Sequence, residues 1–174
     1  SLIVPKNKEA LQIRHKAFDR FARYSYGMLG RTPDYVNTTL AGFFSKSDFF
    51  FLNGNKRFKK NIENFHKEVC QKDLSMTHAI VNATVDKTKS DLQGINEDLT
   101  PRVVRRTKDS IIIRGSKILA TLAPFSDEMF VYPAAPLPAD AGPEYAIAFS
   151  IPMNTKNMYT LCRDHTGING NVRD

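Results

Sequence analysis

The sequence has few of the features that mark specialised classes of protein. Only two of its 174 residues are cysteine, Cys70 and Cys162, and neither has a CxxC spacing or a cluster of histidines beside it. This spacing gives no sign of a disulfide framework or of a zinc site. No apolar run approaches the roughly 20 residues that span a bilayer, and the opening SLIVPKNKEAL lacks the long apolar core of a secretory signal. We therefore expect a cytoplasmic protein without a membrane partner.

The composition is ordinary for a globular chain, apart from its charge. Hydrophobic residues make up 41% and charged residues 25%, while the formal net charge is +7. This excess suits a nucleic-acid surface, an anionic cofactor or a solvated face. The densest basic run, at 56–60, contains Phe58 at the spacing of a buried helical stripe, which favours a solvated helix face. We expect no nucleic-acid partner, although a non-enzymatic basic binding module stays open as an alternative.

The first third of the chain has the apolar spacing of helices. The pattern predicts one helix from Pro5 to Gly27 or Gly30, a second that opens at Thr32 and Pro33, and a third over 58–72. The second helix should break at 53–55. The side chains expected on the apolar faces are Leu11, Phe18, Phe21 and Ala22 in the first helix, Leu40, Phe43 and Phe44 in the second, and Phe58, Ile62, Phe65 and Val69 in the third.

The rest of the chain has short runs of Val, Ile, Thr, Phe and Tyr, which are typical of strands. We predict strands near 76–82, 102–107, 110–114, 116–121, 128–133, 145–151 and 158–162. Lys108 and Asp109 should form the turn of a hairpin, and 133–143 should be a loop. Helices followed by strands predict an α+β protein, with a helical part at 1–75 and a β part at 76–174. The sequence has no internal repeat and no glycine-rich phosphate motif.

Three segments carry side chains that could form a ligand site. GMLGRTPDYVN places Arg31 and Tyr35 one helical turn apart, where a guanidinium and a phenol could meet a ligand's oxygen. LSMTHAIVN places His78 on a strand that should be buried, where a histidine is more often a core residue than a catalyst. RGSKILATLAPFSDE has small residues and Thr121, which would let a flat ligand approach the backbone.

Taken in order, GRTPDY, THAIVN, RGSKILATLAPFSDE and YAIAFSIP resemble the oxygenase components of two-component aromatic hydroxylases, and the 4-hydroxyphenylacetate 3-hydroxylase family in particular. The resemblance covers the chain from about Pro5 to Arg163. It implies an acyl-CoA-dehydrogenase-like fold with a helical N-terminal domain, a β-barrel middle domain and a C-terminal helical bundle. On that pattern the bundle is absent here, so residues 1–75 and 76–174 would each be an incomplete domain.

The resemblance also implies an activity and a set of site residues. The family hydroxylates a phenol ortho to its hydroxyl, using O2 and reduced FAD from a separate flavin reductase. Three catalytic positions near the phenolic oxygen would be Arg31, Tyr35 and His78. The flavin-binding positions would be His78, Ala79, Ile80, Thr84, Val85, Asp86, Lys87 and Thr121. No metal is implied, and the complete protein is expected to be a dimer or tetramer, while the chain by itself is expected to be inactive.

Two departures from the family pattern concern the cofactor and the substrate. After THAIVN the family usually has Pro-Gln-Val-Asp/Asn-Arg, whereas this chain has Ala-Thr-Val-Asp-Lys at 83–87, which removes a bidentate arginine. Pro133 and Ala134 stand where relatives often have hydroxyl side chains toward the substrate's tail. A 4-hydroxybutyryl-CoA dehydratase-like enzyme with FAD and an iron–sulfur cluster is the alternative, but it needs more cysteine and histidine ligands.

Overall fold

The computed structural model describes residues 2–27, 34–51, 54–83, 99–133 and 136–162. Helices come first and strands follow, in the order α1 (Lys8–Tyr24), α2 (Asp34–Ser45), η1 (Ser47–Phe50), α3 (Arg57–Lys72), β1 (Met76–Ala79), β2 (Val81–Asn82), β3 (Arg102–Arg106), β4 (Ile111–Arg114), β5 (Lys117–Ile118), η2 (Ala123–Phe125), β6 (Glu128–Val131), η3 (Pro143–Tyr145) and β7 (Phe149–Pro152). This order confirms the predicted α+β class.

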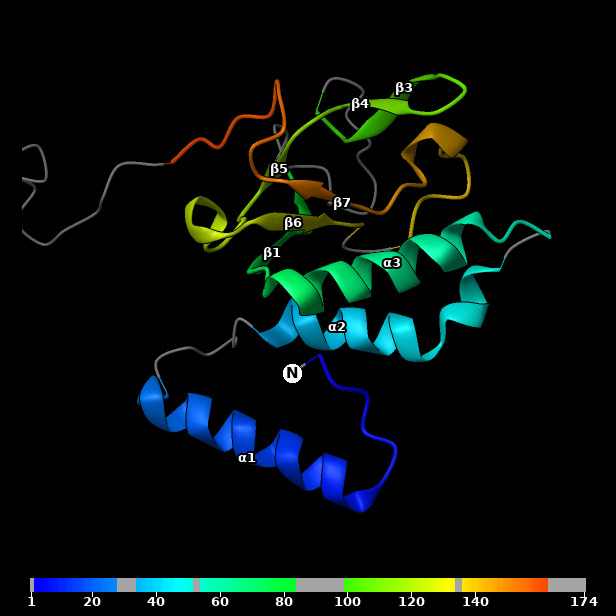
Figure 1. The fold of residues 1–174 in the computed structure, drawn as a ribbon. Coiled ribbons are helices and arrows are strands. Elements are labelled where there is room, and N and C mark those ends of the chain that lie inside the picture. Colours follow the sequence, from blue (N-terminus) through cyan, green and yellow to red (C-terminus); the bar gives the residue numbers. More distant parts are fainter. Residues whose placement is uncertain (1, 28–33, 52–53, 84–98, 134–135, 163–174) are drawn as a thin grey trace, which may run out of the picture.

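A mixed sheet with the order β1-β6-β7 positions the functional side chains. β1 runs parallel to β6, with His78 opposite Phe130, and β6 runs antiparallel to β7. The helices α2 and α3 lie side by side against this sheet, and α1 lies beyond α2 (Figure 1). The remaining strands form two separate pairs, β2 with β5 and β3 with β4. The β-barrel middle domain that the resemblance implies is therefore not shown by the described strands.

The core lies between the two helices and the sheet. It contains Val36 and Leu40 from α2, Val69 from α3, Met76 from β1 and Phe130 from β6. Leu40 and Val69 are fully buried. Because helices and sheet share this one core, the position of β1 and β6 is fixed by the same apolar contacts that fix α2.

Several predicted elements agree with the structure. The third helix was expected over 58–72 and spans Arg57–Lys72, where it ends at Asp73 in a left-handed conformation. The hairpin at Lys108 and Asp109 is confirmed, since β3 and β4 pair antiparallel across the 107–110 turn. His78 lies on a buried strand, as predicted.

Other predictions were wrong in ways that tertiary contacts explain. No strand forms at 158–162, where Tyr159 and Leu161 are more than four-fifths exposed and no neighbouring strand of the described chain pairs with the segment. The strand expected at 145–151 is instead η3 followed by β7 from Phe149. Of the strand expected at 116–121, only Lys117 and Ile118 pair. Apolar composition alone does not make a strand where no ladder partner is available.

Each of the three α-helices differs in part from its expected form. α2 ends at Ser45, before the predicted break at 53–55, and the Ser45 hydroxyl donates to the Gly42 carbonyl oxygen (2.8 Å), which competes with further helical hydrogen bonds. α1 buries none of its residues, and Phe21 on its expected inner face is 45% exposed. Phe58 is 50% exposed because α3 meets the core only from Phe65 onward. The expected start of α2 at Thr32 and Pro33 lies outside the described residues.

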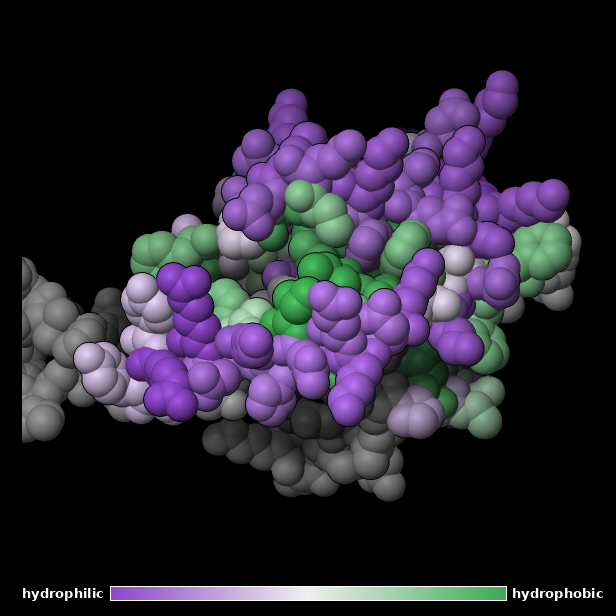
Figure 2. All heavy atoms as spheres, turned by 60° about the horizontal axis from the view of Figure 1, so that its bottom comes forward, coloured by the Kyte–Doolittle hydropathy of each residue, from purple (hydrophilic) through white to green (hydrophobic). Residues whose placement is uncertain are grey.

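Large apolar side chains remain exposed on the surface. On the face shown in Figure 2, hydrophilic side chains surround a central apolar area. The most exposed apolar and aromatic residues of the described chain are Tyr24, Tyr26, Phe49, Leu119, Phe125, Tyr159 and Leu161. A folded chain with this much exposed apolar surface is suited to contact with further protein or with a ligand.

Among the described helices, none has the length and apolarity that crossing a membrane would require.

Candidate active site

Tyr35 and His78 meet between α2 and β1. Tyr35 lies in the first turn of α2, and the rings of the two residues are 5.2 Å apart in an edge-on arrangement. His78 is 9% exposed, while Tyr35 is 43% exposed. A buried imidazole thus lies directly behind a phenol that reaches the surface. This arrangement can present a proton donor and acceptor to a polar group entering from solvent.

Tyr132 completes this group, although the sequence analysis did not single it out. Its hydroxyl oxygen lies 3.0 Å from the hydroxyl oxygen of Tyr35, a hydrogen bond between residues 97 positions apart in the chain. Tyr132 directly follows β6, and its ring meets Phe130 edge-on. The period of two along a strand puts Tyr132 on the same face as the buried Phe130, which is the one signal that could have identified it from sequence.

The register of the sheet explains why these side chains converge. His78 pairs with Phe130, and paired residues of parallel strands point to the same face of the sheet. Phe130 contacts Phe43 of α2 and Phe65 of α3, so this is the face that the helices cover. His78 and Tyr132 therefore point toward α2, where Tyr35 lies in the first turn. The sheet and one helix terminus together fix the group Tyr35, His78 and Tyr132, named here the tyrosine–histidine cluster.

Lys117 holds the backbone beside this cluster. Its ammonium donates to the Ile80 carbonyl oxygen (2.6 Å), the Asn82 side-chain oxygen (2.6 Å) and the Tyr132 carbonyl oxygen (3.4 Å). Burial lowers the pKa of Lys117, whereas the three oxygen atoms stabilise its charged form. The carbonyl of Ile80, an expected flavin contact, is thus already bonded within the chain.

Thr121 lies in a turn that is strained and largely exposed. Its neighbours Leu119 and Leu122 both have positive φ, 62° and 64°, which is rare for residues with side chains. The Thr121 carbonyl oxygen accepts a hydrogen bond from the Thr77 hydroxyl, and this bond ties the turn to β1 one residue before His78. Leu119 is 72% exposed and Phe125 is 81% exposed. The turn therefore presents apolar side chains around an accessible threonine.

The other expected site residues divide into two groups. Ala79 is buried in β1, and Ile80 follows it at the junction with β2. Arg31 and the segment Thr84, Val85, Asp86 and Lys87 lie outside the described residues. The structure thus brings Tyr35 and His78 together and places Thr121 on a turn bonded to the same strand. Arg31 and residues 84–87 are the five expected site residues that it does not describe.

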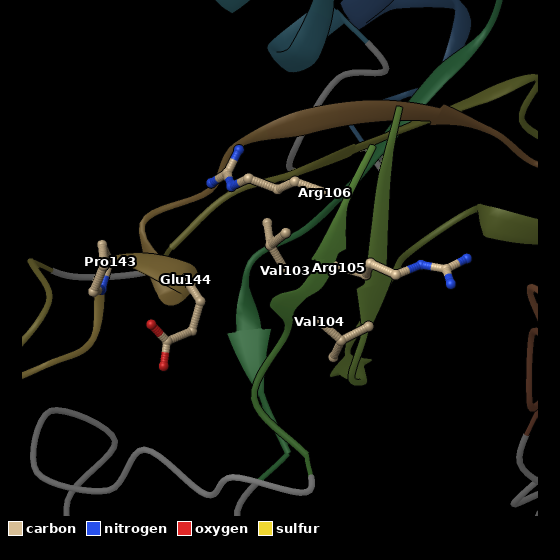
Figure 3. A pocket seen from close by; sticks show the side chains of 6 residues that line it. All are labelled: Val103, Val104, Arg105, Arg106, Pro143 and Glu144. Carbon is tan, nitrogen blue, oxygen red and sulfur yellow. The ribbon is translucent and has the colours of Figure 1, made fainter. Parts of the chain in front are cut away.

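The described part of the chain also has a shallow cavity of about 350 Å³ elsewhere, between β3 and η3 (Figure 3). Val103, Val104, Arg105, Arg106, Pro143 and Glu144 line it. Arg105 points away from Glu144 in this view. None of the expected site residues that the structure describes lines this cavity, and its lining is mostly exposed, so the tyrosine–histidine cluster is the stronger candidate site.

Within the described ranges, no three histidine, cysteine or carboxylate side chains lie close enough together to hold a metal ion. Cys70 and Cys162 are both free and exposed. The polar groups at the cluster are hydroxyls, an imidazole and backbone oxygens, which suit an organic ligand with hydrogen-bonding groups.

Comparison with known proteins shows the family of the chain. Residues 1–173 match the sequence model described as 4-hydroxyphenylacetate 3-hydroxylase N terminal. The chain is 31% identical over 164 residues to the 4-hydroxyphenylacetate 3-monooxygenase oxygenase component of Thermus thermophilus, covering 94% of this chain and 33% of that protein. It is 32% identical over 165 residues to the oxygenase component of the same name from a Geobacillus species, with coverage of 94% and 33%. The chain thus spans about a third of the length of these relatives.

The fold is also similar to that of solved structures. One is the crystal structure of the oxygenase component of 4-hydroxyphenylacetate 3-monooxygenase complexed with FAD and 4-hydroxyphenylacetate, with a TM-score of 0.75 and 31% identity over 88% of this chain and 31% of that chain. Another is an archaeal 4-hydroxybutyryl-CoA dehydratase, with a TM-score of 0.70 at 21% identity over 89% of this chain and 30% of that chain, a likeness of fold alone. The chain belongs to the 4-hydroxyphenylacetate 3-hydroxylase family and corresponds to its N-terminal part.

Proposed function

We propose that this chain supplies the phenol-binding side of the active site of a flavin-dependent aromatic monooxygenase. The substrate is a phenol similar to 4-hydroxyphenylacetate, hydroxylated ortho to its hydroxyl with O2 and reduced FAD. The observation that carries this proposal is the position of Tyr35, whose ring meets that of His78 and whose hydroxyl bonds that of Tyr132. The relatives named for this activity and the related structure solved with FAD and 4-hydroxyphenylacetate support it.

The residues of the cluster suit the chemistry of a phenol. A free phenol has a pKa of about 10, so at neutral pH its ring is a weak nucleophile unless negative charge on its oxygen is stabilised. In this proposal His78 accepts or shares the phenolic proton, and Tyr35 orients the oxygen by a hydrogen bond; the contact between their rings supports these roles. Arg31, in the role that the resemblance implies, adds a fixed positive charge. The ring is thereby activated at the ortho carbon.

The turn at Thr121 fits one side of a flavin. FAD supplies the activation of O2 when it is bound, and the protein supplies its position and surroundings. Thr121 is accessible to bond a polar ring edge, while Leu119, Leu122 and Phe125 offer exposed apolar surface to a flat ring. Ala79, Ile80 and the segment 84–87 would contact the same cofactor, as the resemblance implies. The Lys87 position would lie toward the pyrophosphate, since an anion is best met by a cation.

The proposal includes partners and surroundings. A flavin reductase would deliver the reduced FAD, since the relatives are named as oxygenase components. We place the strands of 76–174 in a larger β-barrel domain, the helices of 1–75 in a helical domain that packs against it through the shared core, and the complete protein in a cytoplasmic dimer or tetramer. The exposed apolar side chains near Thr121 support such further contacts.

The rival functions have less support. A dehydratase with an iron–sulfur cluster is supported only by a likeness of fold at 21% identity, whereas the relatives named as monooxygenases are 31% and 32% identical to this chain. A nucleic-acid-binding module needs free basic side chains, but Lys59 in the densest basic run bonds Asp48 at 2.6 Å. The run lies on the surface of α3, as expected for a solvated helix face.

Reconstitution tests the proposed function. The complete protein is mixed with FAD, a flavin reductase, NADH and 4-hydroxyphenylacetate, and the catechol product is measured against hydrogen peroxide. We expect catechol from the complete protein. The 174-residue chain alone should yield only peroxide, because a site with one wall leaves the reduced flavin open to water. Absence of catechol from the complete protein with every phenol tested would contradict the proposal.

A further inference from the structure

The strands that carry the tyrosine–histidine cluster separate just beyond it. The parallel pairing of β1 with β6 ends at Ala79 and Val131. One residue later the first strand leaves the sheet and, as β2, pairs with β5. At this point the backbone groups of Ile80 and Tyr132 lose their places in the ladder, and buried backbone groups need other partners.

Lys117 occupies this point of separation. Its ammonium bonds the carbonyl oxygens of both Ile80 and Tyr132, the residues that would form the next pair of the ladder. It also bonds the side-chain oxygen of Asn82, its partner in the β2–β5 pairing. One side chain of β5 therefore joins the ends of β1 and β6 beyond their ladder, and it also bonds β2.

The consequence for the cluster is geometric. His78 lies two residues before Ile80, and the Tyr132 side chain begins at the residue whose carbonyl Lys117 holds. The distance between the two strands at this level sets how far the His78 ring lies from the Tyr132 hydroxyl, and with it the orientation of Tyr35. A neutral apolar side chain of similar length could fill the space but could not bond the three oxygen atoms.

We infer that Lys117 is a positioning residue of the active site, which fixes the separation of His78 and Tyr132 by bonding the strand ends that carry them. That these two side chains position a phenol rests on the proposed function. Lys117 is not expected to touch the substrate itself, because its ammonium is directed at three oxygen atoms of the chain.

Three variants of the complete protein separate this role from a general structural one. Lys117→Met removes all three donors and keeps the length of the side chain. Lys117→Arg keeps a positive charge and several donors and should restore part of the function. Lys72→Met is the matched control, since Lys72 bonds Glu68 at 2.6 Å on an exposed helix surface.

The direct readout is the ring signal of His78 in protein made with isotope-labelled histidine, assigned by its loss in His78→Gln. We expect Lys117→Met to shift this signal while Lys72→Met leaves it in place.

The second readout is the hydroxylation assay. Lys117→Met should raise the KM for the phenol by about tenfold, with a smaller change in kcat, because less well positioned His78 and Tyr132 side chains weaken phenol binding first. Lys117→Arg should recover part of that loss.

An unshifted His78 signal in Lys117→Met overturns the inference, as does an unchanged KM with unchanged product yield. If Lys117→Met does not fold, Asn82→Ala removes one acceptor only, and it should shift the same signal by less; no shift there also overturns the inference. If the wild-type protein forms no catechol, the proposed function fails, yet the His78 signal still decides whether Lys117 positions the cluster.

Discussion

At the scale of single residues, the proposed chemistry depends on groups that meet a phenolic oxygen. His78→Ala and Arg31→Ala should each raise the barrier to hydroxylation by about 2–4 kcal/mol, the usual effect of removing one preorganised donor or charge. Folding should persist, since truncation to alanine introduces no new atoms. Product yield per NADH, with circular dichroism as the folding control, gives the result. Unchanged catechol yield in both variants would refute these roles.

Tyr132 offers a finer test, because it acts through Tyr35. Tyr132→Phe removes only the hydroxyl that lies 3.0 Å from the hydroxyl of Tyr35. Loss of one such bond, worth about 0.5–1.5 kcal/mol, should weaken phenol binding about 2- to 10-fold. The dissociation constant for 4-hydroxyphenylacetate measures it. Tyr159→Phe is the control, since Tyr159 is 82% exposed and lies outside the cluster. Equal constants for both variants would argue against a role for Tyr132.

These residues also show what sequence can reveal about the site. The His78 strand was predictable because its burial follows from a local apolar pattern, and the structure confirms it. The contact between Tyr35 and Tyr132 was not predictable, because it joins positions 97 residues apart through a parallel pairing that no local pattern specifies. Lys117 was missed for the same reason. Two of its partners are backbone carbonyls, which carry no mark in the sequence.

At the scale of elements, Gly115 joins β4 to β5 at a close approach of two chain segments. Its φ is +144°, and a β-carbon there would lie 2.4 Å from the Pro101 α-carbon. Gly115→Ala should therefore lower the free energy of unfolding by about 2–3 kcal/mol. Gly42→Ala is the control: it lies in α2 with open space around it and should stabilise by up to about 1 kcal/mol. Denaturant unfolding of both variants measures this, and equal midpoints would contradict the packing described.

The contact between Ser75, which connects α3 to β1, and Asp127, which precedes β6, predicts that the stability of the fold depends on pH. The Ser75 backbone N–H and hydroxyl both donate to the Asp127 carboxylate, and these bonds lower the pKa of Asp127 below its ordinary 3.8. A lowered pKa in the folded state stabilises the fold above the ordinary value, and this stabilisation is lost as pH falls through the lowered value. Asp127→Asn should therefore lose less stability on acidification than the wild type.

The measurement is the thermal midpoint as a function of pH from neutral to strongly acidic. Asp140→Asn, which changes an exposed carboxylate in the loop before η3, serves as the control and should follow the wild-type curve. Parallel curves for Asp127→Asn and the wild type would show that the Ser75 bonds do not stabilise this junction.

Some of the helices and strands were predictable from local sequence signals and others were not. The bounds of α3 and the β3–β4 hairpin followed from local signals, namely a four-three-four apolar spacing and a polar turn. The absence of a strand at 158–162 did not, because a strand needs a partner as well as suitable residues. Local sequence patterns thus predict the helix α3 and the β3–β4 hairpin, whereas the formation of the other strands depends on tertiary contacts.

At the scale of the whole molecule, one core couples the helical part to the sheet. Val36 and Leu40 pack with Val69, Met76 and Phe130, so displacement of α2 would move Tyr35 relative to His78. The chain spans about a third of the length of its relatives. The exposed apolar side chains around Thr121 are where we expect cofactor and further protein to pack.

We propose above all that a phenolic oxygen binds where both the Tyr35 hydroxyl and a ring nitrogen of His78 can bond it. The most direct measurement is a crystal structure of the complete protein with FAD and 4-hydroxyphenylacetate bound. We predict the phenolic oxygen within about 3.2 Å of the Tyr35 hydroxyl and of a ring nitrogen of His78, with the flavin ring against the Thr121 turn. A phenol bound elsewhere, such as in the cavity between β3 and η3, with the tyrosine–histidine cluster free of ligand, would contradict this claim.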